Sequence, residues 1–232
     1  MVPRLFSLVP LVFAVGCGAA FGKARCAANP VGDLLVVGDS ILFYNAPACA
    51  SIGDVAGAAL DMGVHVAAKT GAKVNPEGRY VFGDIREQYV SHPWRWLVLN
   101  GGINDLNQDC GCDECDHVLD SIVSEDGLTG DVPDLIDRAT ADGAQIVLVG
   151  YAELDPEASW GFGVCNDAAD ALETRYRRLA ERRQDVVFVD PSDAISLAGT
   201  PEAYARDGVH PSEAGSAVIG QLVADAIRAS AD

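Results

Sequence analysis

The sequence predicts a single α/β domain, in which a doubly wound, flavodoxin-like parallel sheet of about five strands lies between two layers of helices. Its 232 residues, 49% of them hydrophobic and 22% charged, are enough to bury one sizeable core. Short apolar runs alternate with segments of helical periodicity, which is the pattern of a parallel sheet covered on both faces. No internal repeat, low-complexity tract or linker divides the sequence.

Five short apolar runs are the predicted strands. Most are rich in Val, Leu or Ile and are bounded by turn-forming residues, as expected of strands that are buried on both faces. They cover residues 34–37, 64–67, 96–99, 146–149 and 186–189. In folds of this kind the functional residues lie beyond the carboxyl ends of the strands, so the loops that follow these runs are the places to search.

Five further segments are the predicted helices. Apolar residues recur in them at helical spacing, and several begin with a Ser, Asp or Asn that suits a helix N-cap. They cover residues 51–63, 83–91, 132–143, 166–184 and 211–230.

The N-terminus is similar to a bacterial export signal. Arg4 is followed by an apolar run over residues 5–15, which is too short to span a bilayer. The letters AVGC resemble the lipobox of bacterial lipoproteins, in which cleavage precedes a cysteine that carries lipid. We therefore expect a signal peptide over residues 1–16, a tether over 17–32 with lipid on Cys17, and the folded domain over 33–232. This would place the protein on the periplasmic face of a bacterial membrane. Cleavage after Ala20, giving a secreted protein, is the alternative.

Setting Cys17 aside leaves an even number of cysteines. In an exported chain this is typical of disulfide bonding, although the sequence does not give the connectivity. The cluster CGCDEC could instead supply zinc ligands together with His117 or Cys165, but its spacing is not that of a paired zinc knuckle. The six candidates for disulfides are Cys26, Cys49, Cys110, Cys112, Cys115 and Cys165.

The charge balance excludes several partners. With 34 acidic and 16 basic residues the net charge is −18, which leaves no basic patch to neutralise phosphates. We expect no nucleic-acid partner, membrane contact only through the N-terminal lipid, and a monomer.

Polar clusters follow the first three predicted strands and recur near the C-terminus. GDSI places Ser40 directly after the first strand, KTGAK places Gly71 after the second, and GGIND places Asn104 after the third. DGVHP then supplies Asp207 and His210. Because the carboxyl ends of parallel strands meet at one edge of a sheet, we expect these loops to face one crevice.

These four blocks, in this order, resemble those of the SGNH hydrolases, also called GDSL esterases and lipases. The resemblance implies that Ser40 is the nucleophile and His210 the general base and then acid, with Asp207 orienting the imidazole. It also implies an oxyanion hole made by Ser40, Gly71 and Asn104. The roles are chemically consistent, since a serine hydroxyl becomes a good nucleophile only when a base takes its proton.

The neighbouring residues receive structural interpretations. Asp39 is expected to hold the turn beside Ser40, and Asp105 to cap a helix, a role that is also open to Asn104. His65 is interpreted as an ordinary strand residue.

Other enzyme classes fit less well. An α/β-hydrolase would carry glycine two positions after the nucleophile, where this chain has Leu42. Nucleotide-binding glycine motifs are absent from the sequence, and histidines are too few near Asp39 and Asp105 for a metallophosphoesterase. We expect neither a cofactor nor a metal.

The sequence therefore predicts a serine ester hydrolase that acts on a small-molecule, lipid or carbohydrate ester through an acyl-enzyme. Two alternatives remain open: an O-acyltransferase, and a lipid-anchored binding protein that uses the same fold without catalysis. Selectivity is expected to reside in loops such as the segment that contains Trp160 and Phe162.

Overall fold

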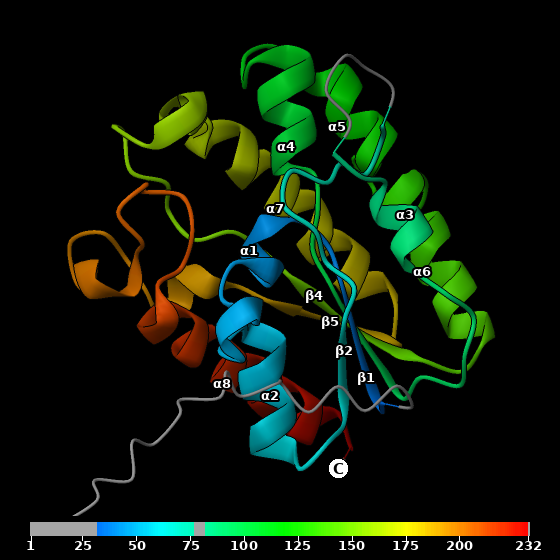
Figure 1. Cartoon of the computed structure of the whole chain (residues 1–232). Helices are drawn as coiled ribbons and strands as arrows, with labels where there is room; N and C mark the ends of the chain where they lie inside the picture. The colour runs from blue at the N-terminus through cyan, green and yellow to red at the C-terminus, as the bar shows by residue number, and fades with distance from the viewer. Residues whose placement is uncertain (1–31, 77–81, 232) are drawn as a thin grey trace, which may run out of the picture.

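A computed structural model describes residues 32–76 and 82–231. The predicted fold class is confirmed: five parallel strands form one sheet in the order β2-β1-β3-β4-β5, with helices on both faces (Figure 1). The expected signal peptide, Cys17 and Cys26 lie outside the described residues. No helix in the described ranges is long and apolar enough to cross a membrane.

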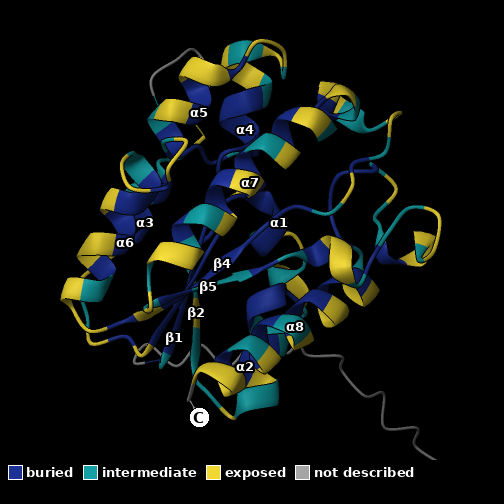
Figure 2. Cartoon of the chain, turned by 180° about the vertical axis from the view of Figure 1, so that it is seen from behind, coloured by how far each residue is buried: buried dark blue, intermediate teal, exposed yellow. Residues whose placement is uncertain are grey.

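The strands lie where the sequence predicts them, to within one residue. Central strands have side chains fully buried on both faces, whereas β2 lies at an edge of the sheet and is only partly buried (Figure 2). The bounds are β1 Leu34–Val37, β2 Val64–Val66, β3 Trp96–Leu99, β4 Gln145–Val149 and β5 Val186–Val189.

The longer helices cover the two faces of the sheet (Figure 1). On one face, α2 (Ile52–Leu60) packs against α8 (Glu213–Ala231), and both contact the strands. On the other, α6 (Asp131–Ala141) packs on β4 and α7 (Asn166–Arg182) packs on β5. Their outward surfaces are exposed, and the surfaces that face the sheet are buried (Figure 2).

Several short elements lie around the carboxyl end of the sheet or beside α6. The helices are α1 Ser40–Phe43, α3 Ile85–Gln88, α4 Ile103–Asp105 and α5 Asp116–Ile122, and a π-helical turn, η2, spans Leu106–Cys110. Single 3₁₀ turns are η1 Ala46–Ala48, η4 Pro191–Asp193 and η5 Pro201–Ala203, and a 3₁₀ segment that is kinked in its middle is η3 Ser159–Val164.

One predicted helix is shorter in the structure, and several short helices were not predicted. The helix expected over residues 83–91 is the single turn α3, because Tyr89 has an extended backbone that stops the helix. The short helix α5 was not predicted, since it follows the cysteine-rich segment directly and has only seven residues.

The strand order creates a crevice at one end of the sheet. β1 lies between β2 and β3 in the sheet. The connection that leaves β1 runs to β2 on one side, and the connection that leaves β3 runs to β4 on the other, so the two connections run in opposite directions. In open α/β sheets, ligands bind at such a switch point, outside the carboxyl ends of the strands. Ser40 follows β1 and Asn104 follows β3, so both lie at this crevice.

Disulfides join the segments on one side of the crevice. Cys110 is bonded to Cys115, and Cys112 is bonded to Cys165, which directly precedes α7. Cys49 is also disulfide-bonded. The sulfurs of the CGCDEC cluster are therefore bonded within disulfides rather than held as a set of zinc ligands.

Candidate active site

Ser40 is positioned by a tightly bonded turn between β1 and α1. Asp39 is the N-cap of α1, and its carboxylate accepts a hydrogen bond from the N–H of Ile41 at 2.9 Å, as the sequence predicts. The side-chain amide of Gln88 holds Gly38 from the other side, accepting from its N–H at 2.7 Å and donating to its C=O at 2.9 Å. The hydroxyl of Ser40 is thereby presented on the first turn of a short helix.

His210 and Asp207 lie on one loop and reach Ser40. The Nε2 atom of His210 is 2.8 Å from Ser40 Oγ, and its Nδ1 atom is 2.9 Å from Asp207 Oδ2. The other carboxylate oxygen of Asp207 accepts the N–H groups of Val209 and His210, both at 2.9 Å. Burial by itself would raise the pKa of Asp207, but these hydrogen bonds outweigh it and hold that pKa below its usual value. Asp207 is therefore ionised at neutral pH and fixes the imidazole with its proton on Nδ1.

Two aromatic rings contact the imidazole. The ring of Tyr44 stacks on His210 with centroids 4.3 Å apart and planes inclined by 6°. Trp160 presents an edge-to-face contact at 6.0 Å. The imidazole is thus held by packing as well as by hydrogen bonds, and neither aromatic contact was predicted from the sequence.

Gly71 and Asn104 lie where they could donate hydrogen bonds to a substrate oxygen. Gly71 has φ +70°, a left-handed conformation that favours glycine, and an added Cβ would meet Phe82 at 3.0 Å. The amide nitrogen of Asn104 donates to the C=O of Ala72 at 2.9 Å, which fixes the orientation of the amide. One of the two amide hydrogens makes this bond, so the other remains for a ligand.

The predicted helix-capping role of Asp105 is wrong. Its carboxylate accepts the N–H groups of Val74 at 3.0 Å and Asn75 at 2.7 Å, so it ties the Gly71 loop to α4. Burial raises the pKa of Asp105 to about 7 even though both hydrogen bonds oppose the shift. Asn104 also caps nothing, because it lies inside α4, whose N-cap is Gly102.

A cleft of about 310 Å³ opens over these groups. The described residues that line it include aromatic and amide side chains around Ser40 and no Asp, Glu, Lys or Arg. No group of three or more His, Cys, Asp or Glu in the described ranges is arranged to hold a metal ion. The residues that line the cleft are Ser40, Thr70, Gly71, Phe82, Asn104, Asn107, Gln108, Trp160, Phe162 and His210.

A buried polar network lies behind the serine turn. Asp39 accepts hydrogen bonds from the Asn100 amide at 2.9 Å and the Tyr151 hydroxyl at 2.7 Å. Burial raises the pKa of Asp39, and these hydrogen bonds act against the shift. The Tyr151 hydroxyl also accepts the N–H of Ile103 at 3.3 Å, so it bridges the turns that carry Ser40 and Asn104.

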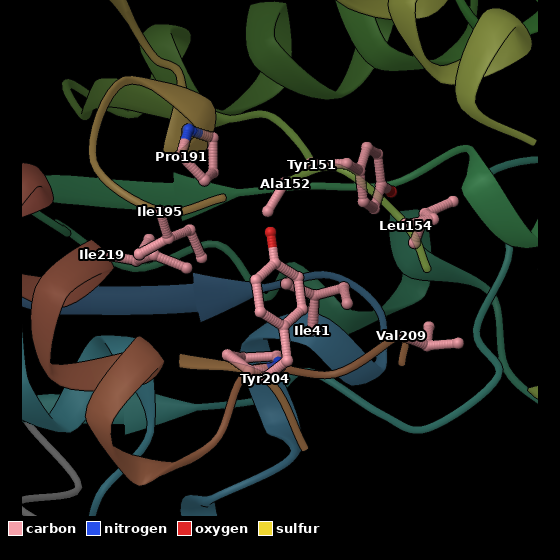
Figure 3. Close-up of a pocket in the computed structure, with 10 residues that line it drawn as sticks. Ile41, Tyr151, Ala152, Leu154, Pro191, Ile195, Tyr204, Val209 and Ile219 are labelled. Carbon is pink, nitrogen blue, oxygen red and sulfur yellow. The ribbon is translucent and has the colours of Figure 1, made fainter. Parts of the chain in front are cut away.

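A small apolar cavity is lined in part by Ile41 of α1 (Figure 3). Ile41 and Val209, the neighbours of Ser40 and His210 in the sequence, form part of its wall. The hydroxyl of Tyr204 points into it toward Ala152 and has no hydrogen-bond partner among the described residues (Figure 3).

Comparison with models of protein families identifies the family of the chain. Residues 36–218 match the family model described as the GDSL-like lipase/acylhydrolase family. The chain belongs to this family. No curated protein matches the sequence.

Solved structures described as a G-D-S-L family member and as carbohydrate esterases share the fold. A carbohydrate acetylesterase family member from Sinorhizobium meliloti is 18% identical, with a TM-score of 0.62 over 85% of this chain and 97% of that one. A lipolytic G-D-S-L family member from Veillonella parvula is 16% identical, with a TM-score of 0.58 over 84% and 97%. A carbohydrate esterase family 2 enzyme with a carbohydrate-binding domain from Corynascus thermopiles is 18% identical, with a TM-score of 0.56 over 85% and 66%.

Proposed function

We propose that this GDSL-like hydrolase cleaves carboxylic esters, with acyl or acetyl groups, through an acyl-enzyme on Ser40. One observation carries the proposal: Ser40, His210 and Asp207 form a continuous hydrogen-bonded chain with separations of 2.8 and 2.9 Å. Nucleophile, base and orienting carboxylate are thus within the reach that acyl transfer requires.

The proposed reaction begins with attack of Ser40 Oγ on the ester carbonyl. His210 Nε2 takes the hydroxyl proton, and Asp207 stabilises the resulting imidazolium through the Nδ1–H bond. The tetrahedral intermediate collapses when His210 returns this proton to the leaving alcohol oxygen. Water then attacks the acyl-enzyme by the same route, which releases the acid and restores Ser40.

The negative oxygen of the intermediate would be held by three donors. The Ser40 N–H lies in the first turn of α1, where no intrahelical acceptor is available. The Gly71 N–H and the second amide hydrogen of Asn104 complete the set. Such preorganised donors are worth about 3–4 kcal/mol each in the transition state.

Transfer of the acyl group to another alcohol instead of water remains the second candidate reaction. The same residues serve both reactions, so the acceptor decides between them. Adding glycerol or a free sugar during turnover separates the two, since a transferase forms a new ester and a hydrolase releases free acid.

The test of this proposal is hydrolysis of p-nitrophenyl acetate and butyrate by wild type and by Ser40→Ala. We expect the variant to lose at least about 10³-fold in kcat, as removal of a serine nucleophile does. Ser230→Ala, which changes an exposed serine on α8, is the matched control and keeps wild-type turnover.

Covalent labelling of Ser40 distinguishes a protein without a reactive serine from an enzyme that does not accept p-nitrophenyl esters. A fluorophosphonate ester should add one phosphonyl group to Ser40 in the wild type and none in Ser40→Ala. Equal p-nitrophenyl release by both proteins, or an unlabelled wild type, would leave the non-catalytic binding protein as the better interpretation.

A further inference from the structure

Two of the most exposed large apolar side chains in the described ranges line the cleft that contains Ser40. Phe82 and Trp160 are each 68% exposed, and they come from segments far apart in the sequence. Scattered exposed apolar residues are ordinary, but aromatic rings gathered at the mouth of a cleft are typical of a ligand-binding surface.

Trp160 is held in position rather than left free at the tip of a loop. Its backbone has φ +58°, which a non-glycine residue keeps only when its surroundings hold it there. The disulfide between Cys165 and Cys112 closes the segment a few residues later, and the ring edge packs on His210. The exposed ring is therefore a preorganised surface.

The direction of the reaction assigns the two rings to different parts of the ester. His210 gives its proton to the leaving alcohol oxygen, so the alcohol portion must lie beside His210 and hence beside Trp160. The carbonyl oxygen must lie near Gly71, against which Phe82 is placed. Trp160 is thus on the alcohol side of the substrate, and Phe82 is close to the acyl carbonyl.

The polar groups of the cleft indicate an uncharged, hydroxyl-rich alcohol. Asn107 and Gln108 line the cleft, and amide side chains can both donate and accept, which matches hydroxyl groups. The Asn107 amide nitrogen also donates to the C=O of Trp160 at 3.5 Å, so its oxygen is the atom left to accept from a ligand. None of the described residues that line the cleft is Lys or Arg, the residues that bind a phosphate. A sugar ring combines hydroxyls at its edge with an apolar C–H face that packs on an aromatic ring.

We propose that Trp160 is the platform on which the alcohol portion of the ester stacks, and that this portion is an uncharged sugar. The inference rests on the proposed ester hydrolysis, and it adds both a specificity-determining residue and a class of substrate.

The test compares one acyl group on two alcohols. Release of acetate from an O-acetylated methyl xyloside and from ethyl acetate is followed by pH-stat for wild type, Trp160→Ala and Trp160→Phe. We expect Trp160→Ala to lower kcat/KM for the sugar ester by roughly 10–100-fold and for ethyl acetate by less than about 3-fold. Trp160→Phe, which keeps an aromatic face, should recover most of the loss. Leu128→Ala, which removes an exposed apolar side chain outside the cleft lining, is the control.

The other outcomes overturn the inference. Equal losses on both esters would mean that Trp160 acts on His210, and unchanged kinetics would mean that no platform is used. Faster turnover of lysophosphatidylcholine than of the acetylated sugar would reject the uncharged sugar.

Binding tests the platform without catalysis. Xylotriose titrated calorimetrically into Ser40→Ala should bind, and the Ser40→Ala/Trp160→Ala protein should bind at least about 10-fold more weakly. This readout also distinguishes two failures: a protein that binds the sugar through Trp160 but hydrolyses no ester rejects the proposed function and keeps the platform. A protein that hydrolyses esters but does not bind the sugar rejects the platform alone.

Discussion

At the scale of single residues, the side-chain amide of Asn104 is fixed both by a hydrogen bond and by burial. One amide hydrogen is engaged by the C=O of Ala72, which prevents the side chain from rotating. Asn104 is also almost fully buried, at 5% exposure, so water competes little for its hydrogen bonds. A donor fixed in this way loses no orientational freedom when charge develops on the substrate oxygen, which is the condition for selective stabilisation of a transition state.

Asn104→Ala should therefore lower kcat by roughly 10²–10³-fold and change KM little. Steady-state kinetics on p-nitrophenyl acetate and a urea melt on the same preparation provide the measurement. If turnover per folded molecule stays near the wild-type value while the protein is destabilised, Asn104 belongs to the scaffold rather than to the oxyanion site.

A pair of tyrosines offers a matched test of buried hydroxyl groups. The Tyr204 hydroxyl has no partner among the described residues, whereas the Tyr176 hydroxyl donates to the C=O of Gly101 at 2.9 Å. Tyr176→Phe should lower the free energy of unfolding by about 1–3 kcal/mol, because it leaves a buried carbonyl unpaired. Tyr204→Phe should leave it unchanged or raise it by up to about 1 kcal/mol. Denaturant melts measure both, and a loss in Tyr204→Phe as large as that in Tyr176→Phe would show that its hydroxyl is bonded.

The sequence predicted the residues that meet at the cleft better than the residues that support them. Ser40 and His210 stand in recognisable motifs, and the structure brings them within 2.8 Å. Tyr151 and Gln88 have no motif: they reach Asp39 and Gly38 from 112 and 50 residues away, through contacts that only the folded chain creates. Asp105 was misinterpreted for the same reason, since a local capping rule cannot foresee a partner in another loop.

At the scale of elements, the loop that follows β2 and the helix α4 behave as one unit. Asp105 accepts two backbone N–H groups of that loop. The fully buried amine of Lys73 on the loop pairs with Asp109 of η2 at 2.6 Å. Gly71 and Asn104, the two proposed oxyanion donors outside the serine turn, are therefore held at a fixed distance by bonds between their elements.

Asp105→Ala should weaken the connection between the loop after β2 and α4, because Asp105 acts as a positioning residue. We expect faster hydrogen exchange at the amides of Val74 and Asn75, a loss of about 1–3 kcal/mol in unfolding free energy, and a fall in kcat of about 10-fold at constant KM. Asp105→Asn keeps one acceptor oxygen and should recover part of kcat. If both variants are destabilised but have wild-type kcat per folded molecule, the hydrogen bonds of Asp105 support the fold and not the proposed oxyanion site.

The elements that the sequence predicted best are those with long periodic patterns. The strands and the helices α2, α6, α7 and α8 have apolar spacing that packing on a sheet requires, so their existence follows from the sequence. The single-turn helices α1 and α4 and the π-helical η2 lack such patterns, because elements of three to five residues are too short to show a helical repeat.

At the scale of the whole molecule, a disulfide and buried carboxyl groups have opposite effects on the free energy of unfolding. The disulfide between Cys112 and Cys165 closes a loop with a sequence separation of 53, worth about 4 kcal/mol by loop entropy. Buried carboxyls act in the opposite direction. Glu173 accepts the N–H of Tyr151 at 2.6 Å and is only 4% exposed, and burial raises its pKa to about 7.

The sign of the pH dependence due to Glu173 follows from this shift. The usual pKa of 4.5 applies to the unfolded chain and about 7 to the folded one, so between these values the folded state keeps a proton that the unfolded state releases. The contribution of Glu173 to the unfolding free energy is thus largest below pH 4.5 and declines until about pH 7. Burial also raises the pKa of Asp105, which adds a pH dependence of the same sign. Wild type and a variant of Glu173 share this contribution, so it cancels when the two proteins are compared.

Glu173→Gln should make this decline measurable. The amide oxygen of Gln can still accept the Tyr151 N–H, but it does not titrate, so the stability of the variant relative to wild type should rise by on the order of 3 kcal/mol between pH 4.5 and pH 7. Urea melts at four pH values across this range give the difference at each point. Glu181→Gln, which changes an exposed position on the same helix α7, is the matched control. A difference for Glu173→Gln that does not change with pH would show that the Glu173 carboxyl is already ionised in the folded protein at acidic pH, stabilised by Arg177 on the next turn of α7.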